Sequence, residues 1–595
     1  MNESNDQVTT EKISEVENPV LETQVEPEPP APEKPKGIPK IAWIAGCGCL
    51  LLSACVAVIA GFVYFGFPLF GGDPIASVVP NSSFMYMSVD LGQTQSDNFN
   101  DIVNIAQEMA DADQGETLAE SMDKLMNDEL DMSFTDDVLP WIGRYGALVV
   151  TDGDLSSGQI EMMFIVQARN KGQADEFISK FITALEDRQN RNFAQSEKDG
   201  VTFYIDKSEF DYEDMVIARS GSLVYLSNSE KAVSDSVNLE KKNSLGGLNT
   251  YNDALAALPK SRLTTFYISG DALSQSFTSS FNAVYGFSSP YIKDLVSEGL
   301  SGMAMSLAIE DQGLRMDAAV VFDESKLSDY QKEVLATKYL KPTTDALVPG
   351  DTFFFVSSNP SQSPSSYTEV DNPLYSSDVT ESFDLLKQEY GIDVRALFDL
   401  LSGEVAFALG PASDGLLAGT DGVNMGMTIL AGTSDEQRFN DWFENVLNTA
   451  FAQDQYIEYD ISDTRIGDYT LKELTIQNGS ESVSALTYGA DNGYIVLGTS
   501  QSMLEGGFTG NATLADNQIY GQTWEAFPGG SVPYMYLNVE EFMNFLADNA
   551  ASFGISDIRD AQNKMRKIPV VAVSMNNTTG SVRTVTMIVF IDKSK

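Results

Sequence analysis

The chain contains no histidine, and its three cysteines, Cys47, Cys49 and Cys55, all lie near its N-terminus. Histidine is the side chain best suited to proton transfer near neutral pH and is a common zinc ligand. Catalytic serine–histidine–acid and cysteine–histidine arrangements are therefore excluded. Residues 56–595 hold no disulfide, thiol nucleophile or thiolate metal site. These absences favour a non-enzymatic protein and leave open only an enzyme that works with carboxylates.

Positive charge is also scarce. The 595 residues include 37 lysines and arginines against 86 aspartates and glutamates, which gives a formal net charge of −49. Such a chain repels the phosphates of DNA and RNA, so we expect no nucleic-acid partner. The hydrophobic fraction of 43% is normal for a folded protein, and the length predicts two or three domains.

Charged residues are missing altogether from Ile41 to Gly72. As a helix, residues 41–67 would be about 40 Å long, which is enough to cross the roughly 30 Å hydrocarbon core of a membrane with some tilt. Trp43 and Tyr64 lie near the two ends, where aromatic rings favour the membrane interface. We therefore predict one transmembrane helix over residues 41–67.

The residues before this segment predict its orientation. Lys34, Lys36 and Lys40 precede it directly, and the positive-inside rule then places the N-terminus in the cytoplasm and the long remainder outside. Residues 1–40 are rich in glutamate and proline. We predict that they form a disordered acidic cytoplasmic tail, because they cannot bury enough apolar surface to fold.

Two other interpretations of the apolar segment stay open. A removable signal peptide would begin nearer residue 1 and have a shorter apolar core. Leu52-Ser53-Ala54-Cys55 is similar to a bacterial lipid-attachment motif, but strongly apolar residues follow it instead of a polar tether. We favour a retained anchor in which Cys47, Cys49 and Cys55 are small side chains that pack beside glycines.

The sequence after the anchor contains two copies of one pattern. "VPNSSFMYMSVD" at residues 79–90 matches "VPGDTFFFVSSN" at 348–359, and "LPWIGRYGALVV" at 139–150 matches "FDLLSGEVAFAL" at 398–409. The clearest match is gapless, between residues 251–273 and 520–542. In each copy it predicts a short helix, a strand and then another helix.

The arrangement of these elements predicts the fold class. Several predicted strands are neighbours joined by short turns, such as those within residues 215–226 and 483–497. Neighbouring strands of this kind favour antiparallel pairing with helices on one face. We predict an α+β fold, duplicated in tandem after a single N-terminal transmembrane helix, with repeat 1 at 75–325, a polar connector at 326–346 and repeat 2 at 347–595.

These motifs resemble a bacterial family of membrane-anchored proteins classified as domain of unknown function 3352. The resemblance rests on the apolar segment before "VPNSSFMYMSVD", on "LPWIG" before a strand, and on the recurring "ALPKS…FYISGDAL" element, and it extends from Ile75 to Lys595. It implies an architecture and a location. The family offers no catalytic residues to carry over.

A search for reactive groups yields no catalytic, cofactor-binding or metal-binding residue. "TDGDLSSGQIE" at 151–161 begins like a calcium loop, but Ser157 occupies the glycine position and Met163 the bidentate glutamate position, so a hairpin turn explains it better. No phosphate-binding GxxxxGK[ST] motif is present.

We therefore expect a membrane-anchored extracytoplasmic envelope protein that acts as a non-enzymatic binding or scaffold module. Its partner would be the membrane itself, an envelope protein or a lipid. A carrier of lipid or another hydrophobic ligand and a carboxylate-dependent envelope hydrolase are the two alternatives. The sequence does not determine the ligand or the oligomeric state.

Overall fold

The computed structural model describes residues 73–91, 101–102, 105, 118–154, 159–198, 200–208, 215–274, 299–361, 377–415, 423–452, 458–478, 481–510, 512–550, 552–553, 555, 558–577 and 580–594. Their strands form one 20-stranded sheet in which every pairing is antiparallel. This confirms the predicted α+β class with antiparallel strands.

The first half of the sheet uses strands from residues 85 to 322. They are β1 (Met85–Asp90), β2 (Ile142–Asp154), β3 (Gln159–Ala168), β4 (Phe193–Lys198), β5 (Val201–Asp206), β6 (Val216–Ser220), β7 (Leu223–Ser227), β8 (Thr264–Ser269), β9 (Leu300–Glu310) and β10 (Gly313–Phe322). Their order in the sheet is β4–β5–β6–β7–β3–β2–β1–β8–β9–β10.

The second half uses strands from residues 354 to 590. They are β11 (Phe354–Ser358), β12 (Leu401–Pro411), β13 (Met425–Thr433), β14 (Tyr459–Ile466), β15 (Tyr469–Asn478), β16 (Glu481–Asp491), β17 (Tyr494–Gly498), β18 (Ser531–Asn538), β19 (Val570–Asn576) and β20 (Val582–Phe590). Their order, β14–β15–β16–β17–β13–β12–β11–β18–β19–β20, is that of the first half with each strand number raised by ten.

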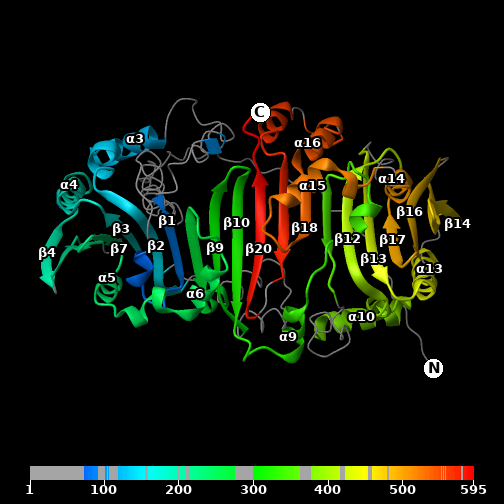
Figure 1. Cartoon of the computed structure of the whole chain (residues 1–595), viewed down its shortest axis with the longest axis horizontal. Coiled ribbons are helices and arrows are strands. Elements are labelled where there is room, and N and C mark those ends of the chain that lie inside the picture. The colour runs from blue at the N-terminus through cyan, green and yellow to red at the C-terminus, as the bar shows by residue number, and fades with distance from the viewer. Residues whose placement is uncertain are drawn as a thin grey trace, which may run out of the picture. The chain divides into compact units, whose positions relative to one another are not determined.

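The two halves meet where β10 pairs with β20 (Figure 1). The ladder runs from Gly313 opposite Phe590 to Val321 opposite Val582, with Asp317 opposite Thr586 at its middle. A Cβ atom on Gly313 would lie 2.2 Å from the carbonyl oxygen of Val589, so this close approach requires glycine. The sheet therefore continues through both halves, although the sequence predicts two separate repeats.

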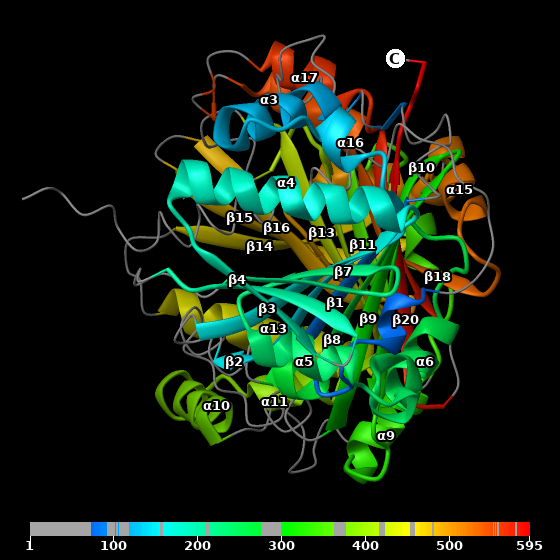
Figure 2. The ribbon, with the colours of Figure 1, turned by 90° about the vertical axis from the view of Figure 1, so that its left-hand side faces the viewer.

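Helices cover the sheet on both faces. They are α3 (Leu118–Leu130), α4 (Lys171–Gln189), α5 (Glu230–Val237), α6 (Asn249–Ala256), α9 (Asp329–Ala336), α10 (Ser377–Tyr390), α11 (Val394–Phe398), α13 (Glu436–Ala452), α14 (Gln501–Phe508), α15 (Gln518–Glu525), α16 (Val539–Asp548) and α17 (Arg559–Met565). In Figure 2, α4 lies on one side of β7 and α5 on the other. The contacts agree, because Val224 of β7 belongs to the core under α4 and Tyr225 to the core under α5.

Short-range sequence signals set the helix ends. Ser229 caps α5 through the backbone N–H of Ala232, and Ser500 caps α14 through that of Met503. These hydroxyls satisfy backbone N–H groups that have no partner within the helix. Asn538 caps α16, and Glu540 lies in its first turn, where the helix dipole favours an acid.

Each half has the same aromatic cluster in its core. In the first half the ring of Tyr251 lies 6.1 Å from that of Tyr86 and 5.3 Å from that of Tyr267, both edge to face. In the second half the ring of Tyr520 lies 6.3 Å from the Phe355 ring and 5.1 Å from the Tyr536 ring, in the same geometry. Edge-to-face pairs at these separations are favourable beyond the area that they bury.

Candidate functional site

The central strands have one sealed face and one partly exposed face. In β9 the alternate residues Ala304, Ser306 and Ala308 are 0%, 4% and 4% exposed, and Met305 between them is 38% exposed. Alternation is expected in a strand, but a polar residue normally occupies the exposed positions of such a pattern. Here the exposed positions are apolar as well, so this face is unusual.

Strand pairing places these apolar side chains in rows that cross the sheet. The first row is Ile309, Leu314, Val589, Val571, Leu537 and Phe354; the second is Leu307, Met316, Met587, Val573, Met535 and Val356; the third is Met305, Ala318, Val585 and Met575. Residues directly opposite in an antiparallel pair project to the same side. We call these three rows the apolar face.

The apolar face contains no charged or hydrogen-bonding side chain, and part of it is accessible. Val585 is 40% exposed and Met305 is 38% exposed, while the other members of the three rows are half-buried. Val405, on the neighbouring strand β12, is 42% exposed. Methionine side chains are flexible and polarisable and therefore adapt to partners of varied shape. The surface is suited to holding an apolar partner.

Helix α6 packs on the sealed face of the middle of the sheet. Tyr251 and Ala254 of α6 belong to the same core as Ala304 and Ala319. On the side of the apolar face, Leu307 and Ile309 pack at its margin against the core beneath α3 and α4. At the far margin, α13 packs on Ala431 and Ile495 through Phe439. Among the described elements, these helices flank the apolar face and do not cross its centre.

The sealed face has a polar pair at the junction of the two halves. Asp317 is 5% exposed, and its Oδ1 accepts a 2.7 Å hydrogen bond from the hydroxyl of the fully buried Thr586. Arg315 donates to both carboxylate oxygens of Asp317. Burial opposes the charge on Arg315, but its hydrogen bond to Asp317 and the nearby acidic charges outweigh burial and raise its pKa. The hydrogen bond between Asp317 and Thr586 joins the two halves, and both side chains are too deeply buried to contact a ligand.

A second buried carboxylate, Glu404 of β12, is 4% exposed. One of its oxygens accepts hydrogen bonds from the hydroxyls of Thr344 and Ser357 at 2.5 and 2.7 Å. The other accepts from the backbone N–H and hydroxyl of Thr343 at 2.8 and 2.6 Å. Glu404 therefore joins Thr343 and Thr344 of the connector to the second half through hydrogen bonds. Its oxygens are buried and already accept several hydrogen bonds, so they are unavailable to a substrate.

Asp345 lies beside this cluster. Burial raises the pKa of Asp345 to about 6, and the charge of Glu404 raises it further. The Tyr520 hydroxyl donates a 3.3 Å hydrogen bond to Asp345, which lowers this pKa. Two carboxylates in a cleft would suit a hydrolase. Because Glu404 is buried and fully hydrogen-bonded, this pair does not support that interpretation.

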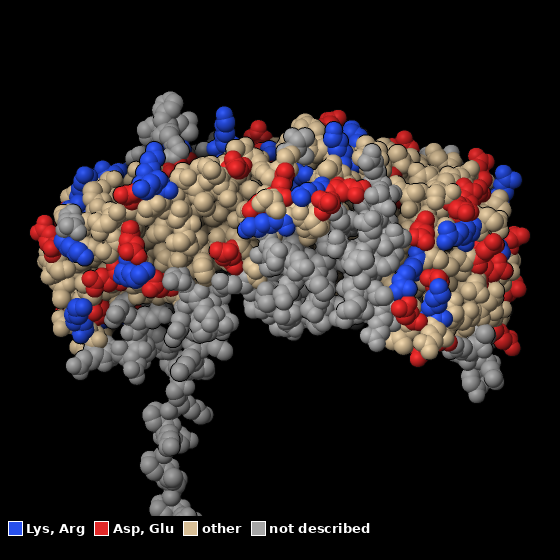
Figure 3. Space-filling model, turned by 90° about the horizontal axis from the view of Figure 1, so that it is seen from below, with Lys and Arg blue, Asp and Glu red and all other residues tan. Residues whose placement is uncertain are grey.

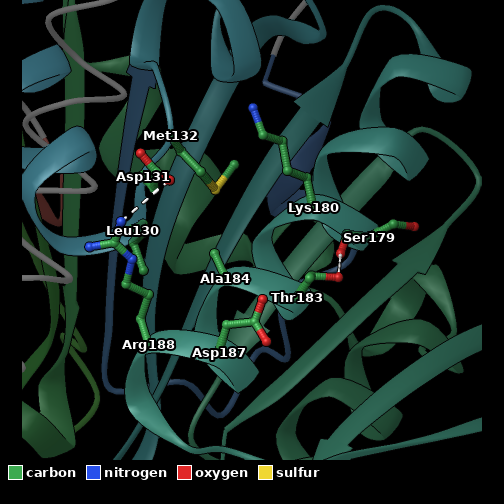
Figure 4. A pocket seen from close by; sticks show the side chains of 9 residues that line it. All are labelled: Leu130, Asp131, Met132, Ser179, Lys180, Thr183, Ala184, Asp187 and Arg188. Carbon is green, nitrogen blue, oxygen red and sulfur yellow. Dashed lines mark hydrogen bonds and ion pairs between the residues drawn. The ribbon is translucent and has the colours of Figure 1, made fainter.

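A shallow depression of about 380 Å³ lies between the end of α3 and α4 (Figure 4). Two of its basic residues form ion pairs: Arg188 lies 3.3 Å from Asp131, and Lys180 lies 2.7 Å from Asp137. The hydroxyls of Ser179 and Thr183 donate to the backbone carbonyl oxygens of Asp175 and Ser179. Figure 3 shows positive and negative side chains intermixed on one side of the molecule rather than gathered into patches of one sign.

The described residues contain no group of three or more acidic side chains placed to hold a metal ion. The calcium-like stretch at 151–161 lies at the β2–β3 hairpin, where Asp152 pairs with Glu161 and Asp154 with Gln159 along the backbone. The hairpin interpretation is therefore confirmed.

The predicted anchor residues, Trp43, Cys47, Cys49, Cys55 and Tyr64, lie outside the described residues. So do the lysines that set the predicted orientation, Lys34, Lys36 and Lys40. Among the helices of the described part, none has the length and hydropathy needed to cross a bilayer. The apolar face itself was missed from the sequence, although the methionines and valines at alternating positions of residues 303–320 and 571–589 were a usable signal.

Comparisons with known proteins place the chain in a family. Among solved structures it is similar to crystal forms III, IV and I of TP0453, at 12%, 10% and 10% sequence identity and TM-scores of 0.23, 0.23 and 0.21. These matches cover 46%, 42% and 46% of this chain and 90%, 81% and 89% of the other. No curated protein matches the chain in sequence. A family model matches residues 46–590, and the chain therefore belongs to the family described as "Protein of unknown function (DUF3352)".

Proposed function

We propose that this chain is a membrane-anchored extracytoplasmic protein that binds the hydrocarbon chain of a lipid on the apolar face and catalyses no reaction. The supporting observation is the uncharged surface of large apolar side chains across β9, β10, β20, β19, β18 and β11. A flexible hydrocarbon needs no hydrogen-bonding partners, whereas a bound protein segment would bring backbone groups that do.

The position of the anchor supports a lipid as the ligand. Asp73 accepts a hydrogen bond from the backbone N–H of Ile75 at 2.9 Å and another from the Tyr86 hydroxyl. Ile75 is fully buried in the core of the first half. Residues 68–72 alone separate Asp73 from the predicted span at 41–67, and an extended link of that length reaches about 20 Å. The folded part would then remain beside the membrane.

The repeated strand order supports a further proposal, that the two halves arose by tandem duplication. Equivalent strands have equivalent neighbours throughout, and the β10–β20 ladder joins the halves through their equivalent last strands. Two copies joined edge to edge make the apolar face wider than either copy alone. In this proposal the duplication creates the binding surface.

Photolabelling of the full chain tests the proposed function. The protein is reconstituted in phosphatidylcholine vesicles that contain a trace of phosphatidylcholine with a diazirine in one acyl chain, and adducts are mapped by peptide mass spectrometry. We expect adducts in residues 299–322 and 570–590 in addition to those in residues 41–67. Adducts confined to residues 41–67 would contradict binding on the apolar face.

A matched pair of variants sharpens the assay. Met305→Gln and Val585→Thr preserve side-chain size at exposed positions and remove apolar surface. Each loses about one buried CH₂ group of interaction, so together they should reduce labelling of the apolar face about tenfold. Ile519→Gln is the control, because Ile519 is 48% exposed on α15, away from these rows. Equal loss in the control would show that the effect is not specific to the face.

A further inference from the structure

We infer that the ligand of the apolar face is a lipid with two hydrocarbon chains, which lie side by side across the strands in the two grooves between the three apolar rows. This inference rests on the proposed function and specifies its ligand class. The spacing of the side chains on the face, which the strand pairing determines, supports it.

The side chains within one row stand close together. Met305, Ala318 and Val585 belong to neighbouring strands, and neighbouring strands of a sheet are about 4.8 Å apart. Along one strand, the next side chain on the same face is two residues away, which is about 6.7 Å. Each row is therefore a ridge that crosses the strands, and a groove separates it from the next row.

The width of such a groove suits one hydrocarbon chain. Two carbon atoms pack at about 3.5–4.0 Å, so a chain that contacts the ridges on both sides needs about 7–8 Å between them. The rows are about 6.7 Å apart, which seats the chain slightly above the line that joins the ridge atoms, whereas the spacing of about 4.8 Å between strands is too narrow. A bound chain therefore lies across the strands and not along them.

The apolar face has two grooves of this kind. Its first row lies at the ends of the strands, because β9 ends at Glu310 and β10 begins at Gly313. Beyond the third row, Val320 of β10 lies opposite Arg583 of β20, so the next row contains a charged side chain. Three apolar rows therefore stand between the strand ends and Arg583, and they enclose two grooves.

Both grooves are long enough for the chains of a membrane lipid. Each row has a member on the four neighbouring strands β9, β10, β20 and β19, and the first two rows continue onto β18 and β11 (Figure 1). The three spacings between four strands give about 14 Å. One leaflet of the roughly 30 Å hydrocarbon core gives each acyl chain about 15 Å. The shorter groove therefore matches the length of one acyl chain.

Two chains joined in one molecule fit these grooves better than two separate molecules. The grooves are parallel neighbours, so two chains that start from one glycerol can enter them from the same end. Once the first chain is bound, the second is held at a high effective concentration, and linkage of this kind raises the overall affinity by about 10²–10⁴-fold. Met305 and Val585, which are 38% and 40% exposed, both lie in the third row, so the second groove is accessible.

Two photoactivatable lipids test the number of chains. Both have a phosphocholine head group and the same diazirine-bearing acyl chain, but one is phosphatidylcholine with a second acyl chain and the other is lysophosphatidylcholine. Each is a trace in phosphatidylcholine vesicles that hold the full protein. Labelling of residues 299–322 and 570–590 is divided by the measured amount of that lipid in the vesicles. We expect this ratio to be about tenfold higher for the two-chain lipid.

A variant that fills the second groove is a matched test. Ala318 is the smallest member of the third row, and Ala318→Trp should reduce labelling by the two-chain lipid to the level of the one-chain lipid, whose own labelling should not change. The control Ala194→Trp makes the same change on the exposed edge strand β4 and should behave as the unmodified protein does. If the urea midpoint shows that Ala318→Trp is poorly folded, Ala318→Leu adds a smaller side chain at the same position.

The position of the diazirine tests the direction of the chains. If the chains cross the strands, a diazirine near the carboxyl end of the acyl chain and one near its methyl end should label different strands, about three strands apart. A chain that follows one strand would bring both positions to that same strand.

The outcomes separate the two proposals. Equal ratios for the two lipids, or labelling of one strand from both diazirine positions, overturn the two-chain inference and leave lipid binding standing. A ratio that stays high in folded Ala318→Trp also overturns it, because the second groove is then not used. Labelling of the face by neither lipid overturns the two-chain inference and the proposed function together.

Discussion

Replacing Glu404 by glutamine should destabilise the second half strongly, although the side chain keeps its shape. Each carboxylate oxygen of Glu404 accepts hydrogen bonds from one threonine backbone N–H and its hydroxyl, at 2.8 and 2.6 Å for Thr343 and 3.3 and 2.5 Å for Thr344. An amide has only one acceptor oxygen, and its NH₂ group must then face one of these two sets of donors. A hydroxyl can rotate to accept from the new NH₂, but a backbone N–H cannot.

The magnitude follows from these losses. One buried N–H without a partner costs about 1–3 kcal/mol, and hydrogen bonds to a neutral acceptor are weaker than those to a carboxylate by about 1 kcal/mol each. The neutral amide is easier to bury than a charged group, which offsets part of this cost. We expect a net loss of about 2–4 kcal/mol in the free energy of unfolding.

Urea denaturation of the full chain, followed by tryptophan fluorescence, measures this loss as a change in midpoint at constant slope. The control is Glu197→Gln on β4, where the carboxylate is exposed and the effect should stay within about 0.5 kcal/mol. The reasoning is refuted if Glu404→Gln and Glu197→Gln shift the midpoint equally.

Three other predictions concern the pH response, the exposed methionines and the anchor. Asp345 has a pKa of about 6 in the folded chain and about 3.9 in an unfolded chain. Protonated Asp345 therefore stabilises the folded state. This stabilisation is complete below about pH 4 and is lost as the pH rises through 6. At pH 7.5 the Asp345→Asn variant should therefore have a free energy of unfolding about 1–2 kcal/mol higher than that of the unmodified chain. At pH 4 urea denaturation should give the two proteins the same free energy of unfolding. Hydrogen peroxide should oxidise Met305, which is 38% exposed, well before Met163, which is fully buried. A bound lipid should slow the oxidation of Met305. Peptide mass spectrometry measures both rates, and equal rates would contradict the exposure of the apolar face. If residues 41–67 are a retained anchor, the full chain should stay with membranes during extraction at pH 11. Deletion of residues 41–67 should then release the protein. Release of the unmodified chain would contradict the predicted anchor.

Local features of the sequence were enough to predict many elements of the fold. The gapless match between residues 251–273 and 520–542 predicts strands at 264–268 and 533–537, and these became β8 and β18 with small extensions. Alternation of side chains and turn residues operates over a few positions, so one sequence reveals it. The capping residues and Glu540 in the first turn of α16 also act over a few positions, but the sequence analysis did not identify the caps.

The candidate site depended on contacts between distant parts of the chain. Met305, Ala318 and Val585 form one row only because β9, β10 and β20 are neighbours, and strand order is decided by the packing of the whole sheet. Likewise, Glu404 meets Thr343 across 61 positions of sequence, which no local pattern predicts.

The sequence by itself determined which reactive side chains the chain lacks, and it predicted an internal repeat and a membrane-spanning segment, because composition and periodicity are properties of the linear chain. Only the tertiary structure decided that the two halves share one sheet, and that their edge-to-edge pairing brings apolar side chains of both halves into common rows. These rows consist of side chains far apart in sequence, and they exist only once the backbone hydrogen bonds of β10 and β20 have fixed the register between them.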